Sequence, residues 1–240
     1  MDSKVYEKLV RDTAKAMYEH ERITAASKAG QIDLQTHVFI RLYSTAFEET
    51  DRAAAILVFA YIEDCLTILI ERHFDQSIAT TANLTGPGGL LGASAARLTL
   101  IAGLGWIDRR TYDALNLVRK IRNLFAHHVD VALFDNKVVA GLISSMPSYE
   151  EAPISAILHG RERRKLNCRE LFFIRSATAI HWLHVEGAVL PLAKEHRVGA
   201  GDVVGTWEEG PVNITEMARA TSRIIVHVYE HGATTPMSAA

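Results

Sequence analysis

The chain has 240 residues, of which 48% are hydrophobic, and a formal net charge of -2. This length is enough for one large domain, or for one domain with an appendage. The near-neutral charge gives no overall attraction to nucleic acid or to an anionic membrane, which argues against a DNA-binding domain with a basic face.

Three features of the sequence indicate the compartment. Cys65 and Cys168 each lie in an apolar helical stretch, where buried free thiols of a reducing compartment are the usual case. The charged N-terminus lacks the apolar region of a secretion signal. The longest uncharged apolar run, residues 53–62, is too short to span a bilayer. We therefore expect a soluble cytoplasmic protein that does not cross a membrane.

The first third of the chain predicts three helices. Residues 4–29 and 33–48 each carry apolar side chains along one stripe. Residues 51–74 are apolar nearly all round, which predicts a central helix covered on most sides. Glu63 and Asp64 lie in its middle and need partners, because an isolated charge in an apolar core is costly. We favour a structural ion pair with an arginine; support of a catalytic group is the alternative.

The loop over residues 76–92 is rich in glycine and contains the run T-G-P-G-G-L-L-G. Glycine-rich loops can bind phosphate, but the dinucleotide-binding type needs a strand before the glycines and a helix after them. Here the preceding segment is helical. We therefore expect the glycines to form a tight bend, rather than a phosphate site.

The middle of the chain predicts two further helices, followed by a segment in which the apolar residues no longer have helical spacing. One helix covers residues 93–104, and a second begins after Asp108, a suitable N-cap. Residues 129–139 instead alternate apolar and polar side chains around the turn signal Asp135-Asn136. This pattern admits a short β-hairpin appendage.

The last third predicts a loop over residues 144–165, a long helix over 167–195, a glycine-rich segment over 198–210 and a final helix that ends at Gly232. The fold class is therefore all-α, a bundle of about six or seven helices. We divide the chain into N-terminal helices (1–50) that pack on the core, the helical core itself (51–196), and the glycine-rich segment with the C-terminal helix (197–240).

Polar chemistry is concentrated in one stretch, R-K-I-R-N-L-F-A-H-H, over residues 119–128. Arg122 provides a fixed cation for a phosphate, and His127 a proton donor or acceptor near neutral pH. Such a pair suits cleavage of a phosphodiester by a 2′-hydroxyl without a metal. On a continuous helix, however, the two residues lie about 140° apart around the axis. They can meet only if the helix breaks near Ala126, or if two chains meet at a dimer axis.

A structural alternative exists for the same two residues. Arg122 would then pair with Glu63 or Asp64, and His127 would cap the carbonyl groups at the C-terminal end of its helix.

These residues resemble known families. Arg122-Asn123-x-x-x-His127 on a helical bundle is similar to the signature of the HEPN superfamily, many of whose members are ribonucleases that act as symmetric dimers. Residues 85–127 resemble the narrower MltR (mannitol operon repressor) family, through a glycine-proline turn, an arginine-bearing helix, a Tyr-Asp-x-Leu helix and the string R-K-I-R-N-L-F-A-H. The resemblance covers residues 51–134. It implies an all-α fold and a role in transcriptional regulation through a protein partner, since the family lacks a recognisable DNA-binding element.

Two functions follow as hypotheses. The first is an MltR-like regulator, a homodimer that acts by contact with another protein and does not bind DNA directly. The second is a toxin-like, metal-independent endoribonuclease. Under this hypothesis Arg122 holds the phosphate of the RNA, His127 transfers protons, and Asn123 has an orienting role in the site. Supporting residues would be Glu63, Asp64, Arg119 and His128. A helical bundle that binds a small ligand is a weaker third hypothesis.

Two histidine pairs have spacings that also occur in metal sites. His181 and His184 are three residues apart, and His227 and His231 are four apart, so each pair shares one helix face. No cysteine or carboxylate cluster completes either set. We therefore expect packing or surface roles for them, with no metal and no other cofactor.

Overall fold

The structure is a computed structural model, which describes residue 8 and residues 10–13, 36–74, 80–131, 133–147, 165–189, 212–234 and 237. The described residues form helices and connections without a strand, which confirms the all-α class. The helices are α2 (Thr36–Glu48), α3 (Asp51–His73), α4 (Thr81–Thr85), α5 (Ser94–Gly103), α6 (Arg109–His127), α7 (Lys137–Ser145), α9 (Cys168–His184), the π-helix η2 (Val185–Val189) and α11 (Val212–His231).

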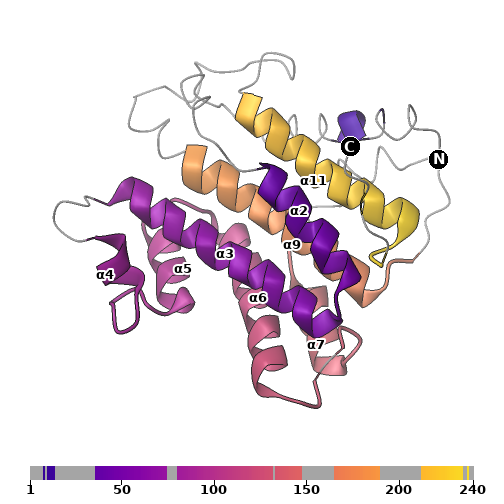
Figure 1. Cartoon of the computed structure of the whole chain (residues 1–240), viewed down its shortest axis with the longest axis horizontal. Helices are drawn as coiled ribbons and strands as arrows, with labels where there is room; N and C mark the ends of the chain where they lie inside the picture. The colour runs from indigo at the N-terminus through magenta and orange to yellow at the C-terminus, as the bar shows by residue number, and fades with distance from the viewer. Residues whose placement is uncertain are drawn as a thin grey trace.

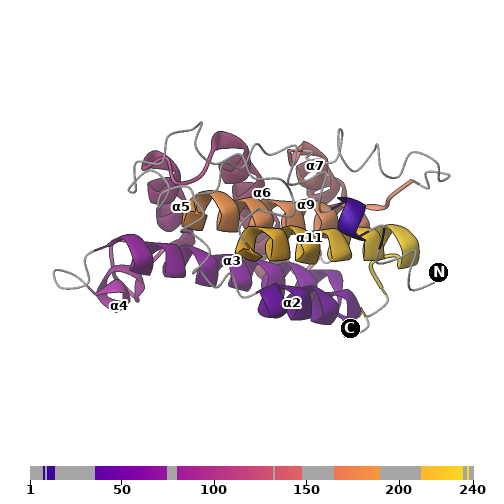
Figure 2. The ribbon, with the colours of Figure 1, turned by 90° about the horizontal axis from the view of Figure 1, so that it is seen from above.

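Helix α9 is the centre of the bundle. It packs against α3, α6, α7 and α11, and most of its side chains are buried. Figure 1 shows α9 and α11 side by side behind α2 and α3. Seen from above in Figure 2, α2 and α3 lie on one side of α9, and α5, α6 and α7 lie on the other. Aromatic rings fill the space around it: Phe39, Tyr43, Phe47, Phe134, Phe172 and Phe173.

Helix α3 is less covered than its composition predicts. Its bounds agree with the expected range, and Thr50 caps its N-terminus by accepting a hydrogen bond from the Ala53 amide. Its length and composition would suit a membrane span, yet half of that stretch is buried inside the protein. Ile56, Ala60 and Asp64 are exposed along the outward face. Helix α3 contacts α2, α4, α5, α6 and α9, and this stripe is a part that those helices leave exposed.

A buried ion pair joins several elements. Arg169, in the first turn of α9, contacts the carboxylate of Asp51, in the first turn of α3. The same guanidinium donates to carbonyls at the end of α2 and just beyond α11, those of Ala46, Phe47, Glu49 and Ala233. The N-terminal helix α2 and the C-terminal helix α11 therefore share one core with α3 and α9.

Several local predictions need correction. The predicted hairpin is not found, because the described part of residues 129–139 contains turns, followed by helix α7 from Lys137. The turn signal itself was correct: Asn136 is the N-cap of α7 and accepts from the Val138 amide. The glycine-rich loop contains the short helix α4, which the sequence did not predict. Helix α7 also occupies the start of the loop expected over residues 144–165.

The long helix expected over residues 167–195 is α9 followed by η2, up to Val189. It begins with a reciprocal capping box between Asn167 and Glu170. Residues 190–211, with the glycine-rich segment, lie outside the described residues, as does most of the helix predicted over 4–29. The final helix ends at Gly232 as predicted, and this glycine has a positive φ of 81°.

Candidate functional site on helix α6

Helix α6 carries the polar stretch and is continuous. Asp108 caps its N-terminus by accepting a hydrogen bond of 2.7 Å from the Thr111 amide. The helix then runs without a break to His127. Arg122 and His127 therefore stay about 140° apart around the axis, and the break near Ala126 does not occur. A single chain does not direct both side chains to one point.

The guanidinium of Arg122 lies at the boundary between α6 and α3. It is half-buried, donates a hydrogen bond of 3.1 Å to the side chain of Asn123, and lies 5.7 Å from the centroid of the Phe59 ring. Among the described residues it has no carboxylate partner. The expected ion pair of Arg122 with Glu63 or Asp64 is therefore wrong.

The structural ion pair with an arginine that the sequence favours for Glu63 or Asp64 is confirmed at Glu63, with a different arginine as its partner. Its carboxylate lies 3.8 Å from the guanidinium of Arg97 on α5. Arg97 is largely buried and also donates to the Thr67 hydroxyl at 2.7 Å and to the Gly92 carbonyl at 3.2 Å. Glu63 thus helps to hold the glycine-rich loop against α3, and does not contact the polar stretch of α6.

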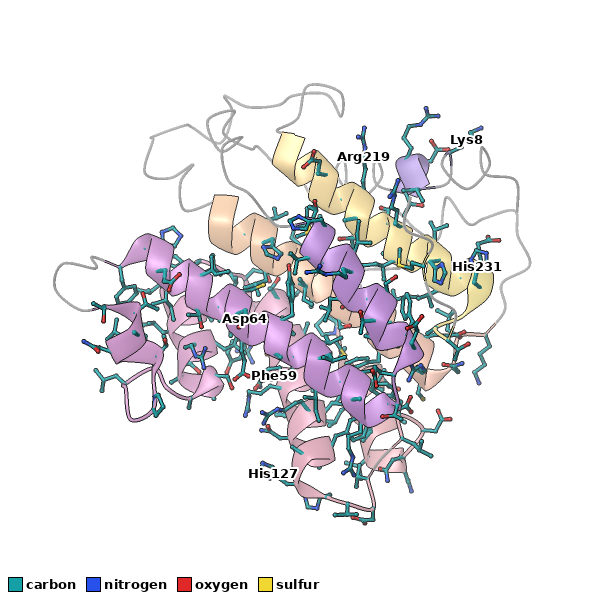
Figure 3. All side chains as sticks on the ribbon, in the orientation of Figure 1. Lys8, Phe59, Asp64, His127, Arg219 and His231 are labelled. Atoms are coloured by element: carbon teal, nitrogen blue, oxygen red, sulfur yellow. The ribbon has the colours of Figure 1, made fainter. Side chains whose placement is uncertain are left out.

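The remaining predicted residues are dispersed. Asp64 is exposed on α3, and Figure 3 shows it well apart from His127, which lies at the far end of α6. Arg119 is half-buried and donates to Asn116 on its own helix, at 2.9 and 3.1 Å. His127 and His128 are both exposed. Arg122 and Asn123 are thus hydrogen-bonded to each other, and among the described residues neither forms a hydrogen bond or ion pair with Glu63, Asp64 or His127.

Arg52 caps the end of α6 in place of His127. Its guanidinium donates to the carbonyls of His128, Val129 and Val131, at 2.9, 3.0 and 3.3 Å. The sequence analysis missed this role, because the arginine lies on α3 and no local pattern connects it to the end of another helix.

The connection from α6 to α7 and the first turn of α7 expose large apolar side chains. The exposed fractions are 87% for Val129, 63% for Leu133 and 59% for Val138. Val129 and Leu133 lie in the connection, and Val138 lies in the first turn of α7. Arg52 binds the Val129 carbonyl, and the Asp51 carboxylate accepts a hydrogen bond of 2.7 Å from the amide of Phe134, the residue after Leu133. We call Val129, Leu133 and Val138 the apolar connection.

The two histidine pairs have contacts within the bundle. His181 is buried, with Nδ1 3.4 Å from the Thr221 hydroxyl. His227 stacks on the ring of Phe47 and on exposed His231. Within the described ranges, no group of three or more His, Cys, Asp or Glu side chains is placed to hold a metal ion.

Comparison with known proteins leaves the family assignment a prediction. No family model, no curated protein and no solved structure matches this chain. The resemblance to the MltR family and to the HEPN superfamily therefore depends on the residues of the polar stretch and of the segment before it.

Proposed function

We propose that the chain is a non-enzymatic regulator of transcription that acts by binding another protein, as its resemblance to the MltR family implies. The apolar connection carries this proposal. Large apolar side chains that are exposed to water can mark a protein-binding surface. Arg52 and Asp51 already bind the backbone at Val129 and Phe134. Little of the binding free energy would therefore be lost to ordering this surface when a partner binds. A complementary partner would offer an apolar groove.

The protein would act as a homodimer in the cytoplasm. The exposed apolar residues Ile56 and Ala60, on the outward face of α3, support packing against a second copy across a two-fold axis. Cys65 and Cys168 are not joined in a disulfide, which fits a reducing compartment. Ile56→Glu should convert the dimer into a monomer in light scattering. Lys120→Glu, an exposed change on α6, is the control and should leave the mass unchanged.

The partner surface can be tested in cells of the native host. Replacing Val129 and Leu133 with aspartate should change transcript levels as deletion of the gene does, while the purified variant keeps its helical circular dichroism. It should also lose a protein that co-purifies with the wild type. Leu90→Asp is the matched control, because Leu90 is 87% exposed on the glycine-rich loop, away from this surface. If the control variant changes transcripts equally, the surface assignment is wrong.

A metal-independent endoribonuclease is the second candidate. The observation that favours it is the cation of Arg122, which lacks a carboxylate partner among the described residues and has Asn123 beside it, together with the exposure of His127. Since one chain separates Arg122 from His127, a second copy would have to complete the site. His127 would accept the proton of the 2′-hydroxyl, while Arg122 holds the phosphate.

RNA cleavage by the purified protein in EDTA tests this candidate. Under the ribonuclease hypothesis, the wild type cleaves and His127→Ala does not, while His37→Ala retains activity because it removes an exposed histidine on α2, outside the proposed site. No cleavage by the wild type, or equal loss in both variants, would exclude His127 as the proton-transfer group.

A further inference from the structure

A cysteine, a histidine and a tyrosine meet where α3 contacts the end of α9. Tyr61 and Cys65 are one helical turn apart on α3 and face His184, the last residue of α9. The Nε2 atom of His184 lies 3.5 Å from the Cys65 sulfur and 3.2 Å from the Tyr61 hydroxyl. Cys65 is 4% exposed, and His184 is half-buried. The helix changes from α to π directly after His184, and such changes are frequent at functional sites.

The three side chains have complementary chemistry. A thiol beside an imidazole can transfer its proton to the ring, and the resulting cation stabilises the thiolate. Burial, followed by the neighbouring Cys65, raises the pKa of Tyr61, with smaller contributions from Tyr43 and Asp64. The hydroxyl of Tyr61 therefore stays protonated near neutral pH and can donate a hydrogen bond to a negative sulfur. His184 is half-buried and is therefore the more exposed member of the pair with Cys65.

The second cysteine provides an internal contrast. Cys168, the first residue of α9, is half-buried and so more accessible than Cys65. Burial and the adjacent Asp135 raise the pKa of its thiol, which keeps it in the less reactive protonated form. Accessibility alone therefore predicts that Cys168 reacts first, whereas activation by a histidine predicts that Cys65 does.

We propose that Cys65 and His184 form a thiolate–imidazolium pair and that Cys65 is a peroxide-reactive site. The thiolate sulfur attacks one oxygen of hydrogen peroxide, so that an S–O bond forms as the O–O bond breaks. The departing hydroxide takes the proton from Nε2 of His184 and leaves as water. Sulfur is oxidised to a sulfenic acid and the peroxide is reduced.

The added oxygen would enter a tightly packed boundary. One turn along α3 from Cys65, the side chain of Leu69 packs so closely on Gly187 of η2 that a β-carbon there would lie 2.7 Å from it. Oxidation of Cys65 should therefore loosen the contact between α3 and η2 and lower the melting temperature of the protein.

The experiment treats the full chain with limiting hydrogen peroxide, traps sulfenic acid with dimedone and quantifies both cysteines by peptide mass spectrometry. Cys65 should be labelled before Cys168, and its alkylation by iodoacetamide should show an inflection below the ordinary thiol pKa of about 8.5. His184→Gln should slow labelling of Cys65 by about tenfold or more and leave Cys168 unchanged. His128→Gln, which removes an exposed histidine elsewhere, is the matched control.

Two results would overturn the assignment. One is faster labelling of Cys168 than of Cys65 in the wild type. The other is an unchanged rate at Cys65 in a folded His184→Gln protein. If that variant does not fold, the wild-type pH profile decides, because an inflection at or above about 8.5 describes an ordinary buried thiol.

Discussion

Arg169 and Asp51 form an ion pair whose side chains are only 13% and 16% exposed, at a point where α2, α3 and α9 meet. Neither group is left with a single partner. The other carboxylate oxygen of Asp51 accepts from the Phe134 amide, and the guanidinium of Arg169 binds carbonyls at the end of α2. The contacts among α2, α3 and α9 at this point therefore depend on the ion pair of Arg169 and Asp51.

The first prediction concerns this junction. Arg169→Lys keeps the charge but removes the planar set of donors, so the carbonyls at the end of α2 and beyond α11 lose a hydrogen-bond donor. We expect the free energy of unfolding in urea to fall by about 2–4 kcal/mol. Arg109→Lys is the control, because Arg109 pairs with Asp113 on the exposed surface of α6, and should leave the urea midpoint unchanged. Equal effects of the two changes would contradict a special role for Arg169.

The second prediction concerns alkaline pH. Burial raises the pKa of Tyr43 and of Tyr61 above the ordinary value of 10.0. In the unfolded chain both phenols lose their proton near pH 10 while the folded protein keeps them. The unfolded state then binds fewer protons, so stability is fully present below pH 10 and falls as pH rises above it.

The expected slope is about 1.4 kcal/mol per pH unit for each tyrosine. Urea unfolding of the wild type at pH 9, 10 and 11 measures it. The double variant Tyr43→Phe, Tyr61→Phe is less stable at pH 9 but should show a shallower decline above pH 10. An identical decline in wild type and variant would assign the alkaline effect to other groups.

The third prediction concerns the backbone of the apolar connection. Arg52→Met removes the donors to the carbonyls of His128, Val129 and Val131, so this segment should open more readily. Hydrogen–deuterium exchange should be faster in peptides covering residues 128–134, by about tenfold or more. Arg41→Met, at an exposed position of α2, removes the same charge and should leave these peptides unchanged.

The fourth prediction separates two glycines. A β-carbon at Gly89 would lie 2.3 Å from the Leu84 carbonyl oxygen, so Gly89→Ala must displace backbone and should destabilise the protein by about 1–3 kcal/mol. A β-carbon at Gly103, at the end of α5, meets no atom within 4 Å. Gly103→Ala should therefore stabilise the helix by about 0.5 kcal/mol. Thermal unfolding measures both variants. A change of the same sign in the two melting temperatures would contradict the close approach of backbone at Gly89.

The sequence predicted those features that local patterns determine. Asp108 caps α6 and the range of α3 was correct, because capping residues and helical periodicity act within a few neighbouring residues. The alternation over residues 129–139 suggested a hairpin, but a short alternating run does not exclude helix, and Val139 is buried in α7.

The sequence predicted a stretch of candidate residues, but not how these residues are arranged in space. The sequence proposed Arg122, Asn123 and His127 as site residues, and an ion pair of Glu63 or Asp64 with an arginine. That pair forms at Glu63, but its partner is Arg97 and not Arg122. Arg97 and Arg122 both lie on helices that pack against α3. Which arginine reaches Glu63 depends on the rotation of each helix about its own axis where it packs against α3. Tertiary packing sets that rotation.

Asp51 and Arg52 are neighbours in the chain, and together they bind the backbone at Val129 and at Phe134. Asp51 is also bound to Arg169 in the buried junction. If the proposed partner binds at Val129 and Leu133, its binding is therefore thermodynamically linked to the stability of the whole bundle. A partner present at 100 times its dissociation constant would add about 2.7 kcal/mol to the free energy of unfolding. A mutation in the junction would weaken that partner's binding without touching it.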